Sequence, residues 1–241
     1  MKTDFRANAS PDIKMMFLIK RKPGTTREQL LAYWFAHHMP GTIKAMGDVA
    51  RGYVGTVFKA DTADDYPWDG VAQMFLKKPL KTPLEGFGAR PADSFHELVQ
   101  PYFGWATREY LVLDGSEFLP VRPLTLNAPF PTTRSGFFKV THLVKSIPGA
   151  DHDTLNAYWL SDHASMVADL MRQVGGFHFA VGISLEPDDA PYAGIEEFYF
   201  HEPAAWKRYQ ELVAPDALSQ WCSEADSHTL FADTEFVAIP V

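Results

Sequence analysis

The sequence of 241 residues contains a single cysteine, Cys222, so no disulfide can form within the chain. A protein without disulfides fits a reducing compartment, and we therefore expect a cytoplasmic location. The first residues lack the apolar run of a signal peptide, and no stretch approaches the roughly 18 consecutive apolar residues of a membrane span. The sequence therefore predicts no membrane segment.

Basic charge is also scarce, since the formal net charge is −8. This argues against a nucleic-acid partner, which requires clustered Lys and Arg side chains. The sequence has no glycine-rich nucleotide-binding loop, no paired cysteines or His-Glu-x-x-His for zinc, and no Gly-x-Ser-x-Gly nucleophile elbow. We accordingly predict neither an organic cofactor nor a metal.

What the sequence does contain is a repeat. The pattern Lys-x-x-Pro-Gly followed by Tyr-Trp-x-x-x-His occupies residues 20–38 and recurs at residues 145–163. The offset is constant, since 163 − 38 = 125 and 145 − 20 = 125. Such self-similarity indicates two copies of one module packed as a pseudo-dimer. We place the first copy at 1–117, a proline-rich linker at 118–135, and the second copy at 136–241.

Each copy is predicted to have the order strand, helix, strand, strand, helix, strand. Thr26, with Gln29 three residues later, is a capping box for the first helix, and Asp151 or Asp153 can cap its counterpart. The second helices are expected at 93–100 and from 203 to about 213. The strands are expected at 15–21, 53–58, 71–76 and 107–113, and at 137–145, 178–185, 195–201 and 234–239.

This order is that of a ferredoxin-like unit, in which helices cover one face of an antiparallel sheet. The bare face must be covered, and a second copy within the same chain can supply the covering sheet. The predicted fold class is therefore α+β, with two ferredoxin-like repeats whose facing antiparallel sheets form an intrachain dimeric α/β barrel.

The residues resemble the EthD-like family of the dimeric α/β-barrel superfamily. The resemblance rests on Lys-x-x-Pro-Gly, on Tyr-Trp-x-x-x-His, on His38-Met39-Pro40 and on Asp69-Gly70 before the third strand. The second copy departs from it at Ala164-Ser165 and Ala193-Gly194. The resemblance implies a pocket between the sheets. Its superfamily includes cyclases, isomerases, decarboxylases and cofactor-independent monooxygenases, so the fold leaves the reaction open.

Period-2 alternation then predicts which strand residues face that pocket. In the second copy these are His142, His178, Glu197 and Tyr199, because Lys139 and Lys145 on the other face of the first strand are expected to meet solvent. We align them with less titratable residues of the first copy, which would form the apolar, substrate-binding wall: Phe17, Tyr53, Gln73 and Phe75. Ordinary sequence divergence is the alternative explanation of this difference.

Two further histidines recur at the ends of the repeated helices. His38 and His163 each share a helix face with a tryptophan four residues earlier. Each can reach over the sheet rim to the mouth of the pocket, or can stabilise the helix C-terminus as a cation. Both roles remain open, and we include both histidines among the candidate catalytic residues.

The first functional hypothesis is a cofactor-independent enzyme acting on a hydrophobic, aromatic or polyketide-like small molecule. His178 or His142 would be the general base or acid, Glu197 its partner, and Tyr199 a hydrogen-bond donor to a developing phenolate or enolate. The reaction would be a lyase, cyclase or isomerase step. The alternatives are a cofactor-free monooxygenase and a non-catalytic protein that binds a hydrophobe or haem. Pairing of two such chains into a homodimer is left open.

Overall fold

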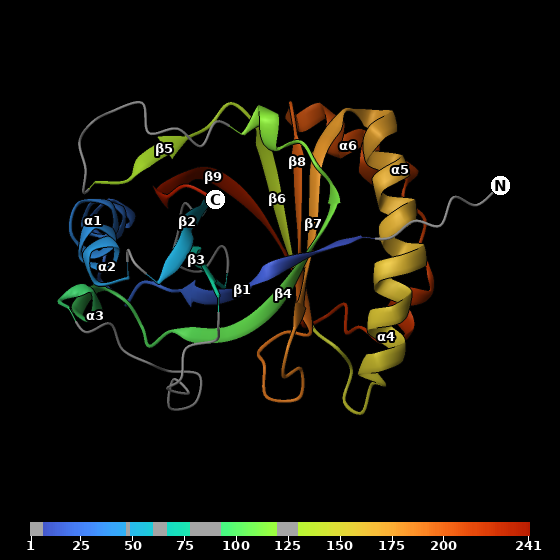
Figure 1. Ribbon diagram of the computed structural model, residues 1–241, viewed down its shortest axis with the longest axis horizontal. Coiled ribbons are helices and arrows are strands. Elements are labelled where there is room, and N and C mark those ends of the chain that lie inside the picture. Colours follow the sequence, from blue (N-terminus) through green and yellow to red (C-terminus); the bar gives the residue numbers. More distant parts are fainter. Residues whose placement is uncertain (1–6, 47–48, 60–66, 78–92, 120–129) are drawn as a thin grey trace. The chain divides into compact units, whose positions relative to one another are not determined.

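The computed structural model describes residues 7–46, 49–59, 67–77, 93–119 and 130–241 (Figure 1). The strands are β1 Asn8–Ile19, β2 Ala50–Phe58, β3 Gly70–Leu76, β4 Phe103–Leu113, β5 Thr132–Arg134, β6 Phe138–Val144, β7 Gly176–Ser184, β8 Gly194–Phe200 and β9 His228–Ile239. The α-helices are α1 Arg27–Tyr33, α2 Met39–Met46, α3 Phe95–Leu98, α4 His152–Tyr158, α5 Ala164–Val174 and α6 Pro203–Leu212. The chain is thus a mixed α/β protein, and most of the predicted linker, residues 120–129, lies outside the described residues.

The strands form a large antiparallel sheet. Their hydrogen-bonded order is β2-β3-β1-β4-β7-β8-β6-β9-β5, and an additional pairing of β2 with β9 returns the order to its first strand. The third strand of each half pairs with two strands of the same half, since β3 lies between β2 and β1, and β8 between β7 and β6.

The last strand of each half, β4 or β9, is shared between two compact units. The chain forms two compact units: a C-terminal unit of Met1–Pro11, Thr107–Leu119 and Gly136–Phe231, and an N-terminal unit of Asp12–Ala106, Pro120–Ser135 and Ala232–Val241. Within the C-terminal unit, β4 pairs with β7 from Thr107 onward. Within the N-terminal unit, β9 pairs with β2 from Ala232 onward. Each compact unit therefore takes a strand segment from the other half of the sequence.

The first helix of each half begins at a residue that the sequence predicts. Thr26 accepts a hydrogen bond from the backbone N–H of Gln29, whose side chain accepts one from Thr26 in return. Asp151, rather than Asp153, caps α4 by accepting from the backbone of Asp153 and Thr154. Each of these helices then widens into one π turn, η1 Trp34–His38 and η3 Trp159–His163, before α2 and α5 continue. The sequence pattern did not predict these π turns.

Other boundaries differ from the prediction. The strand β1 begins at Asn8 instead of residue 15, and β9 begins at His228 instead of residue 234. The strand β9 is longer because it pairs with β6 in the C-terminal unit and with β2 in the N-terminal unit, and β1 extends across the boundary between the two units at Pro11 and Asp12. The second helix of the first half has only the four residues of α3, whereas α6 has ten.

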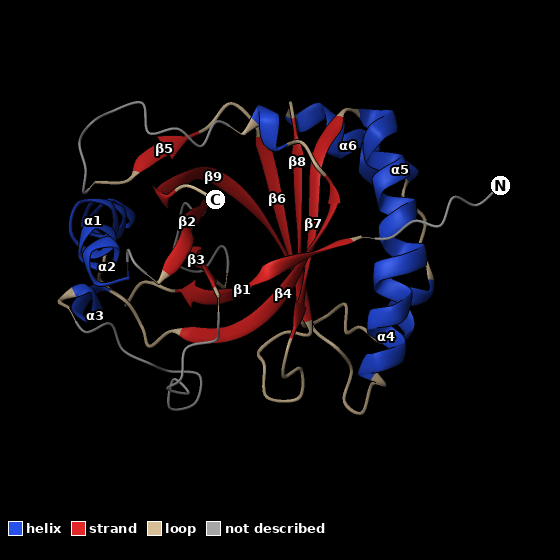
Figure 2. Cartoon of the chain, in the orientation of Figure 1, coloured by secondary structure: helices blue, strands red, loops and turns tan. Residues whose placement is uncertain are grey.

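Each unit has its own core between helices and sheet. Trp34 and Trp159 are fully buried at its centre, packed with the leucines one helical turn earlier, Leu30 and Leu155. Figure 2 shows the helices of the C-terminal unit, α4, α5 and α6, along one side of β6, β7 and β8. None of the helices in the described ranges is long and apolar enough to cross a membrane.

The tryptophans explain the glycines that begin the third strands. A Cβ atom added at Gly194 would lie 2.9 Å from Cη2 of Trp159 and would also collide with the backbone carbonyl of Gly182. The same crowding occurs at Gly70, where an added Cβ atom would lie 2.9 Å from Cζ3 of Trp34. A glycine is therefore required at both positions so that the ring can approach the backbone closely.

We expect Gly194→Ala to lower the free energy of unfolding by about 1–3 kcal/mol, because the colliding carbonyl cannot move without disturbing the sheet. The measurement is urea unfolding followed by circular dichroism. Gly41→Ala is the control, since nothing lies within 4 Å of that position in α2 and a helical alanine should be neutral or stabilising by up to about 1 kcal/mol. Equal midpoints for Gly194→Ala and the unchanged chain would contradict the packing argument.

Candidate functional site

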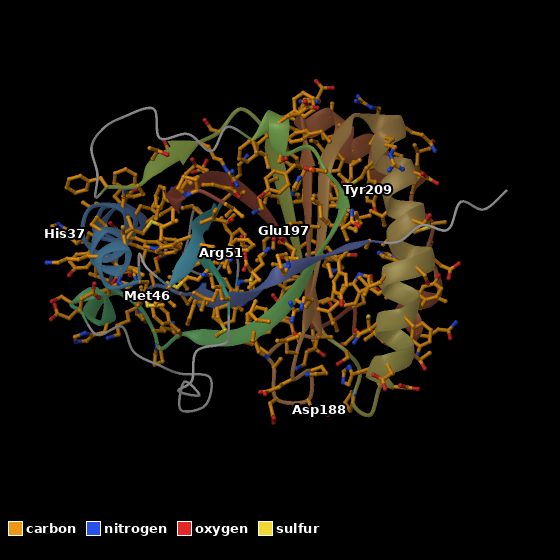
Figure 3. The ribbon with its side chains drawn as sticks, in the orientation of Figure 1. His37, Met46, Arg51, Asp188, Glu197 and Tyr209 are labelled. Carbon is orange, nitrogen blue, oxygen red and sulfur yellow. The ribbon has the colours of Figure 1, made fainter. Side chains whose placement is uncertain are left out.

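The strands of the C-terminal unit carry polar groups on both faces. One face packs against α4, α5 and α6, and the other has no helix of this unit on it. Figure 3 shows Glu197 of β8 and Tyr209 of α6 on opposite sides of these strands. Consecutive residues of a strand point to opposite faces, so Glu196 and Glu197 belong to two different clusters.

Glu196 is the centre of the cluster on the helix-covered face. Its side chain is 3% exposed, and three donors surround it. Oε1 accepts from Nε1 of Trp159 at 2.8 Å and from Nε2 of His163 at 2.9 Å. Oε2 lies 3.1 Å from Nδ1 of His142 on the adjacent strand. Nδ1 of His163 lies 2.7 Å from Oδ2 of Asp216, which joins a second carboxylate to the cluster.

The π turn explains why Trp159 and His163 reach the same oxygen. Its hydrogen bonds run from residue i to residue i+5, so the turn is wider than an α-helical one. Side chains four residues apart are then brought more nearly above each other, and both ring N–H groups point at Oε1. Single π turns occur often at functional sites.

The charges of this cluster are strongly coupled. Burial alone would raise the pKa of the Glu196 carboxyl, but the charge of His163 and the hydrogen bonds from His142 and His163 hold it far below its usual range. Burial alone would lower the pKa of His163, but Glu196 and Asp216 raise it to about 10. Near neutral pH the cluster therefore contains an ionised Glu196 and a protonated His163.

An ionised carboxylate only accepts hydrogen bonds, so Nδ1 of His142 must carry the proton that points to Glu196. Whenever the ring is neutral, its lone pair is therefore on Nε2. The side chain is 32% exposed, and within the part of the chain that the structure describes Nε2 has no hydrogen-bond partner. The orientation of the His142 ring is thus fixed by a buried carboxylate.

The N-terminal unit contains a related but different arrangement. Nδ1 of His38 lies 2.9 Å from Oδ2 of Asp93, just as Nδ1 of His163 lies beside Oδ2 of Asp216. Nε2 of His38, however, lies 3.1 Å from the hydroxyl of Tyr102, and Nε1 of Trp34 donates to the hydroxyl of Tyr53 at 3.5 Å. Phenol groups thus take the place that a carboxylate occupies in the C-terminal unit. Both histidines hold an aspartate through Nδ1, but only His163 contacts a buried acid of the sheet, Glu196.

The helix-free face of the C-terminal unit carries the second cluster. Nζ of Lys139 lies 2.7 Å from Oε1 of Glu197, and both side chains are at most 5% exposed. The same ammonium lies 4.8 Å from the ring centroid of Tyr199, whose ring meets His178 edge-on at 5.2 Å between centroids. Near these groups the hydroxyl of Thr141 is buried and, among the described residues, has no hydrogen-bond partner.

His178 is held as a neutral donor in this second cluster. Burial lowers its pKa, although the charges of Glu109 and Glu197 oppose the effect. The backbone N–H of Gly115 donates to Nδ1 at 3.3 Å, which places the ring proton on Nε2. This state suits hydrogen-bond donation to a substrate oxygen better than proton abstraction.

No family model matches the chain, and no curated protein matches it. Solved structures do match it over nearly the whole length. An anthrone oxidase-like protein superposes with a TM-score of 0.58 at 11% identity, covering 95% of this chain and 94% of the other. A mutant of chlorite dismutase from Candidatus Nitrospira defluvii gives 0.54 at 10% identity, with 94% and 91% covered. A proposed monooxygenase from Fusobacterium nucleatum gives 0.50 at 5% identity, with 95% and 96% covered.

The chain shares the fold of these proteins, a mixed α/β arrangement with a large antiparallel sheet that is consistent with a dimeric α/β barrel. At such low identity the likeness establishes the fold alone, and the chemistry must be argued from the residues. Among the described residues no group of three or more His, Cys, Asp or Glu side chains is arranged to hold a metal ion.

Three of the predicted site residues lie on the other face from the one expected. His142 lies on the helix-covered side of β6, the same side as Val140. Phe17 lies on the helix-covered side of β1, in the same core cluster as Leu30. The prediction failed because Lys139, which was expected to meet solvent, is fully buried in an ion pair.

Tyr53 also lies on the helix-covered face, against Trp34. The alignment of Tyr53 with His178 was wrong by one residue, because Tyr53 pairs with Met74 whereas Phe179 pairs with Phe198 in the same position of the other half. Irregularities near the start of β2 and β7 change the number of residues between the repeated motif and the paired positions. A change of one residue moves a side chain to the opposite face of the strand.

The other candidates lie on the faces that alternation predicts. Glu197, Tyr199 and His178 share the helix-free face of the C-terminal unit. Gln73 and Phe75 occupy the corresponding face of the N-terminal unit, where Nζ of Lys14 lies 5.4 Å from the ring centroid of Phe75. Their proposed roles are untested by this placement.

The sequence reasoning did not include Glu196 among the candidate site residues. The signal was available: Glu196 alternates with Phe198 and Phe200, and an acid on an apolar strand face must find a buried partner. Asp216 gave no such signal, because it lies 53 residues from His163 in a loop before the 3₁₀ turn Ala217–Gln220.

Proposed function

We propose that the chain is an enzyme that moves protons by general acid/base catalysis, without a cofactor, on a hydrophobic aromatic or polyketide-like small molecule. The reaction would be a lyase, cyclase or isomerase step, and His142 would be the base. One observation carries the proposal: Nδ1 of His142 is held by the ionised, buried Glu196 while its Nε2 remains available.

The chemistry follows from this geometry. Imidazole titrates near neutral pH, so the lone pair of Nε2 can take a proton from an acidic C–H or O–H group. The proton makes His142 a cation, and the adjacent carboxylate of Glu196 stabilises that charge without moving. The same group then returns the proton at another substrate atom, which completes an isomerisation, a cyclisation or an elimination.

The N-terminal unit serves as an internal comparison. Phe17 occupies the position of His142 there, since Phe17 pairs with Ala72 whereas His142 pairs with Glu196. That unit keeps the π-turn histidine, His38, but has Phe17 and Ala72 at the positions of His142 and Glu196. The pair His142 and Glu196 is therefore dispensable for this packing arrangement, which supports a chemical role in the other unit.

His178, Glu197 and Tyr199 lie on the opposite face of the strands and cannot act on the same substrate atom as His142. We keep them as a second candidate group, in which Tyr199 or His178 would donate a hydrogen bond to a substrate oxygen. Gln73 and Phe75 would line the corresponding face of the other unit.

We infer further that the two halves are copies of one EthD-like module, at 1–117 and 136–241. The equal element order and the recurring Trp–His π turns support this duplication. The pairings of β4 and β9 support the duplication as well. The last strand of the first half, β4, pairs with β7 of the second half, and the last strand of the second half, β9, pairs with β2 of the first half.

Proton transfer can be measured without knowing the substrate, by following deuterium uptake from D₂O into a cyclic aromatic 1,3-diketone with NMR. We expect His142→Phe, which copies the residue of the other unit, to lower the exchange rate by about 100-fold. Its cost in stability should be small, because phenylalanine is accepted at the equivalent position. His152→Gln is the control, since Nε2 of that histidine lies beside the exposed Asp188 and not beside a buried carboxylate. Enzyme-dependent exchange that survives His142→Phe would disprove the assignment.

A second candidate function, haem binding, is favoured by the same tautomer. A histidine that donates Nδ1–H to a carboxylate and offers Nε2 is the usual form of a metal-ligating histidine. Bound haem would supply redox chemistry, and His142 is the residue that would hold its iron, through Nε2. Titration with haem separates the possibilities, because a Soret band that disappears in His142→Phe supports binding at this residue. Oxygen consumption during turnover without haem would instead indicate a cofactor-free monooxygenase.

A further inference from the structure

The two ring nitrogens of His163 both face carboxylate oxygens. Nε2 lies 2.9 Å from Oε1 of Glu196, and Nδ1 lies 2.7 Å from Oδ2 of Asp216. A neutral imidazole has only one N–H group, so it could satisfy only one of two ionised carboxylates and would set a lone pair against the other. Burial tends to raise the pKa values of both carboxyl groups, but the contacts with His163 lower them, so both carboxylates are ionised, and the geometry is then satisfied only when His163 is protonated on both nitrogens.

From this geometry we propose that His163 is a positioning residue: a permanent cation that keeps Glu196 ionised and so fixes the proton of His142 on Nδ1. It does not itself transfer protons. Its positive charge lies between two negative ones, and the buried Glu196 would otherwise be neutralised by the cost of desolvation. The connection to catalysis rests on the proposed function, whereas the charge arrangement stands by itself.

The surroundings support a fixed charge. The side chain of His163 is 11% exposed and that of Asp216 is 16% exposed, so water screens the three charges only weakly. Asp216 is held in place because its other oxygen accepts from the backbone N–H of Leu218 at 3.0 Å. Burial raises the pKa of Cys222 to about 12 and also raises that of Tyr209, so both neighbours stay neutral. Among the described residues, the titratable groups around His163 are then Glu196 and Asp216, with His142 reached through Glu196 and Tyr158 through Asp216.

The counterpart in the N-terminal unit makes a matched comparison. His38 also binds an aspartate through Nδ1, but its Nε2 faces the hydroxyl of Tyr102, which can donate as well as accept. The geometry there accepts a neutral imidazole. A doubly protonated state is therefore demanded of His163 and not of His38.

The test is NMR spectroscopy of the full chain labelled with ¹⁵N and ¹³C, between about pH 3 and 9, a range that includes the ordinary pKa values of carboxyl and imidazole groups. Long-range ¹H–¹⁵N correlations report whether each ring nitrogen carries a proton, and the signals are identified by His163→Gln and His142→Gln. We expect both nitrogens of His163 to remain protonated up to at least pH 8.5. Neutral His142 should show a proton on Nδ1 and none on Nε2.

Two variants test the positioning role. Asp216→Asn removes one negative charge at a partly exposed position and should bring the titration of His163 down into the measured range. In His163→Gln the amide can still donate to Glu196, so the titration of the Glu196 carboxyl, followed by its ¹³C shift, should move to higher pH. His38→Gln should leave both titrations unchanged. A purely structural clamp would give the same folded spectra without these changes of titration.

A His163 ring that becomes neutral between pH 6 and 8 would overturn the proposal and would leave the role of His142 standing. An unchanged Glu196 titration in His163→Gln would overturn it equally. If the NMR results agree but His142→Phe keeps its exchange activity, the proposed function fails while the charge arrangement survives. Should His163→Gln not fold, Asp216→Asn alone decides.

Discussion

Glu196→Leu is expected to lower the free energy of unfolding by about 3–5 kcal/mol, since it breaks a buried ion pair and removes one of the two counter-charges of His163. His163 would then face only Asp216, and the buried N–H of Trp159 would lose its acceptor. Glu196→Gln keeps an acceptor oxygen of similar shape and should cost less, about 1–3 kcal/mol.

The loss should depend on pH in a defined direction. The pKa of His163 rises from 6.5 to about 10 on folding, so its stabilisation is complete below pH 6.5 and disappears as the pH rises through about 10. The pKa of Glu196 falls from 4.5, so its stabilisation is present above pH 4.5 and is lost as the pH falls further. The difference between the unchanged chain and Glu196→Leu should thus be largest between about pH 4.5 and 6.5 and shrink toward pH 10.

Urea unfolding midpoints at pH 6 and 9 measure this dependence. Glu202→Gln is the control, because Glu202 forms only an exposed pair with Arg208, with side chains 59% and 49% exposed. Such a pair contributes within about 0.5 kcal/mol. A Glu196→Leu variant that unfolds at the same urea concentration as the unchanged chain would show that the carboxylate is not a structural centre.

The sequence predicts those parts of the fold that depend on local signals. The capping residues Thr26 and Asp151 begin their helices as expected, and alternation assigns Glu197 and Tyr199 to the correct face. These signals act over a few residues, so they are visible in the order of the amino acids. The π turn at Trp159–His163 is not, because its extra width depends on what the side chains contact across the core.

The misassigned residues show where local reasoning ends. The face of β6 was decided by treating Lys139 as a solvent-exposed residue, yet its partner Glu197 lies 58 residues further along the chain (197 − 139 = 58). Tyr53 was placed by counting residues from a repeated motif, and the strand irregularity that changes the count has no sequence signature. The exchange of β4 and β9 between the compact units is likewise a property of long-range pairing.

The ion pair that misled this assignment leads to the last prediction. Lys139→Met and Glu197→Leu should each lower the free energy of unfolding by about 3–5 kcal/mol. Each variant removes the buried ion pair and leaves the other member as a charged side chain that is at most 5% exposed. The double variant should cost much less than the sum of the two. We expect a coupling free energy of about 2 kcal/mol in the double-mutant cycle, measured by urea unfolding.

The N-terminal unit again provides the matched cycle. Lys14 and Gln73 occupy the positions of Lys139 and Glu197, but Gln73 is neutral. The coupling between Lys14→Met and Gln73→Leu should therefore be well below that of the charged pair. Equal couplings in the two cycles would mean that packing of the lysine stem, rather than charge, holds these side chains together. That result would also weaken the case for a second polar group at Lys139, Glu197 and Tyr199, since the group depends on a buried charge that its carboxylate neutralises.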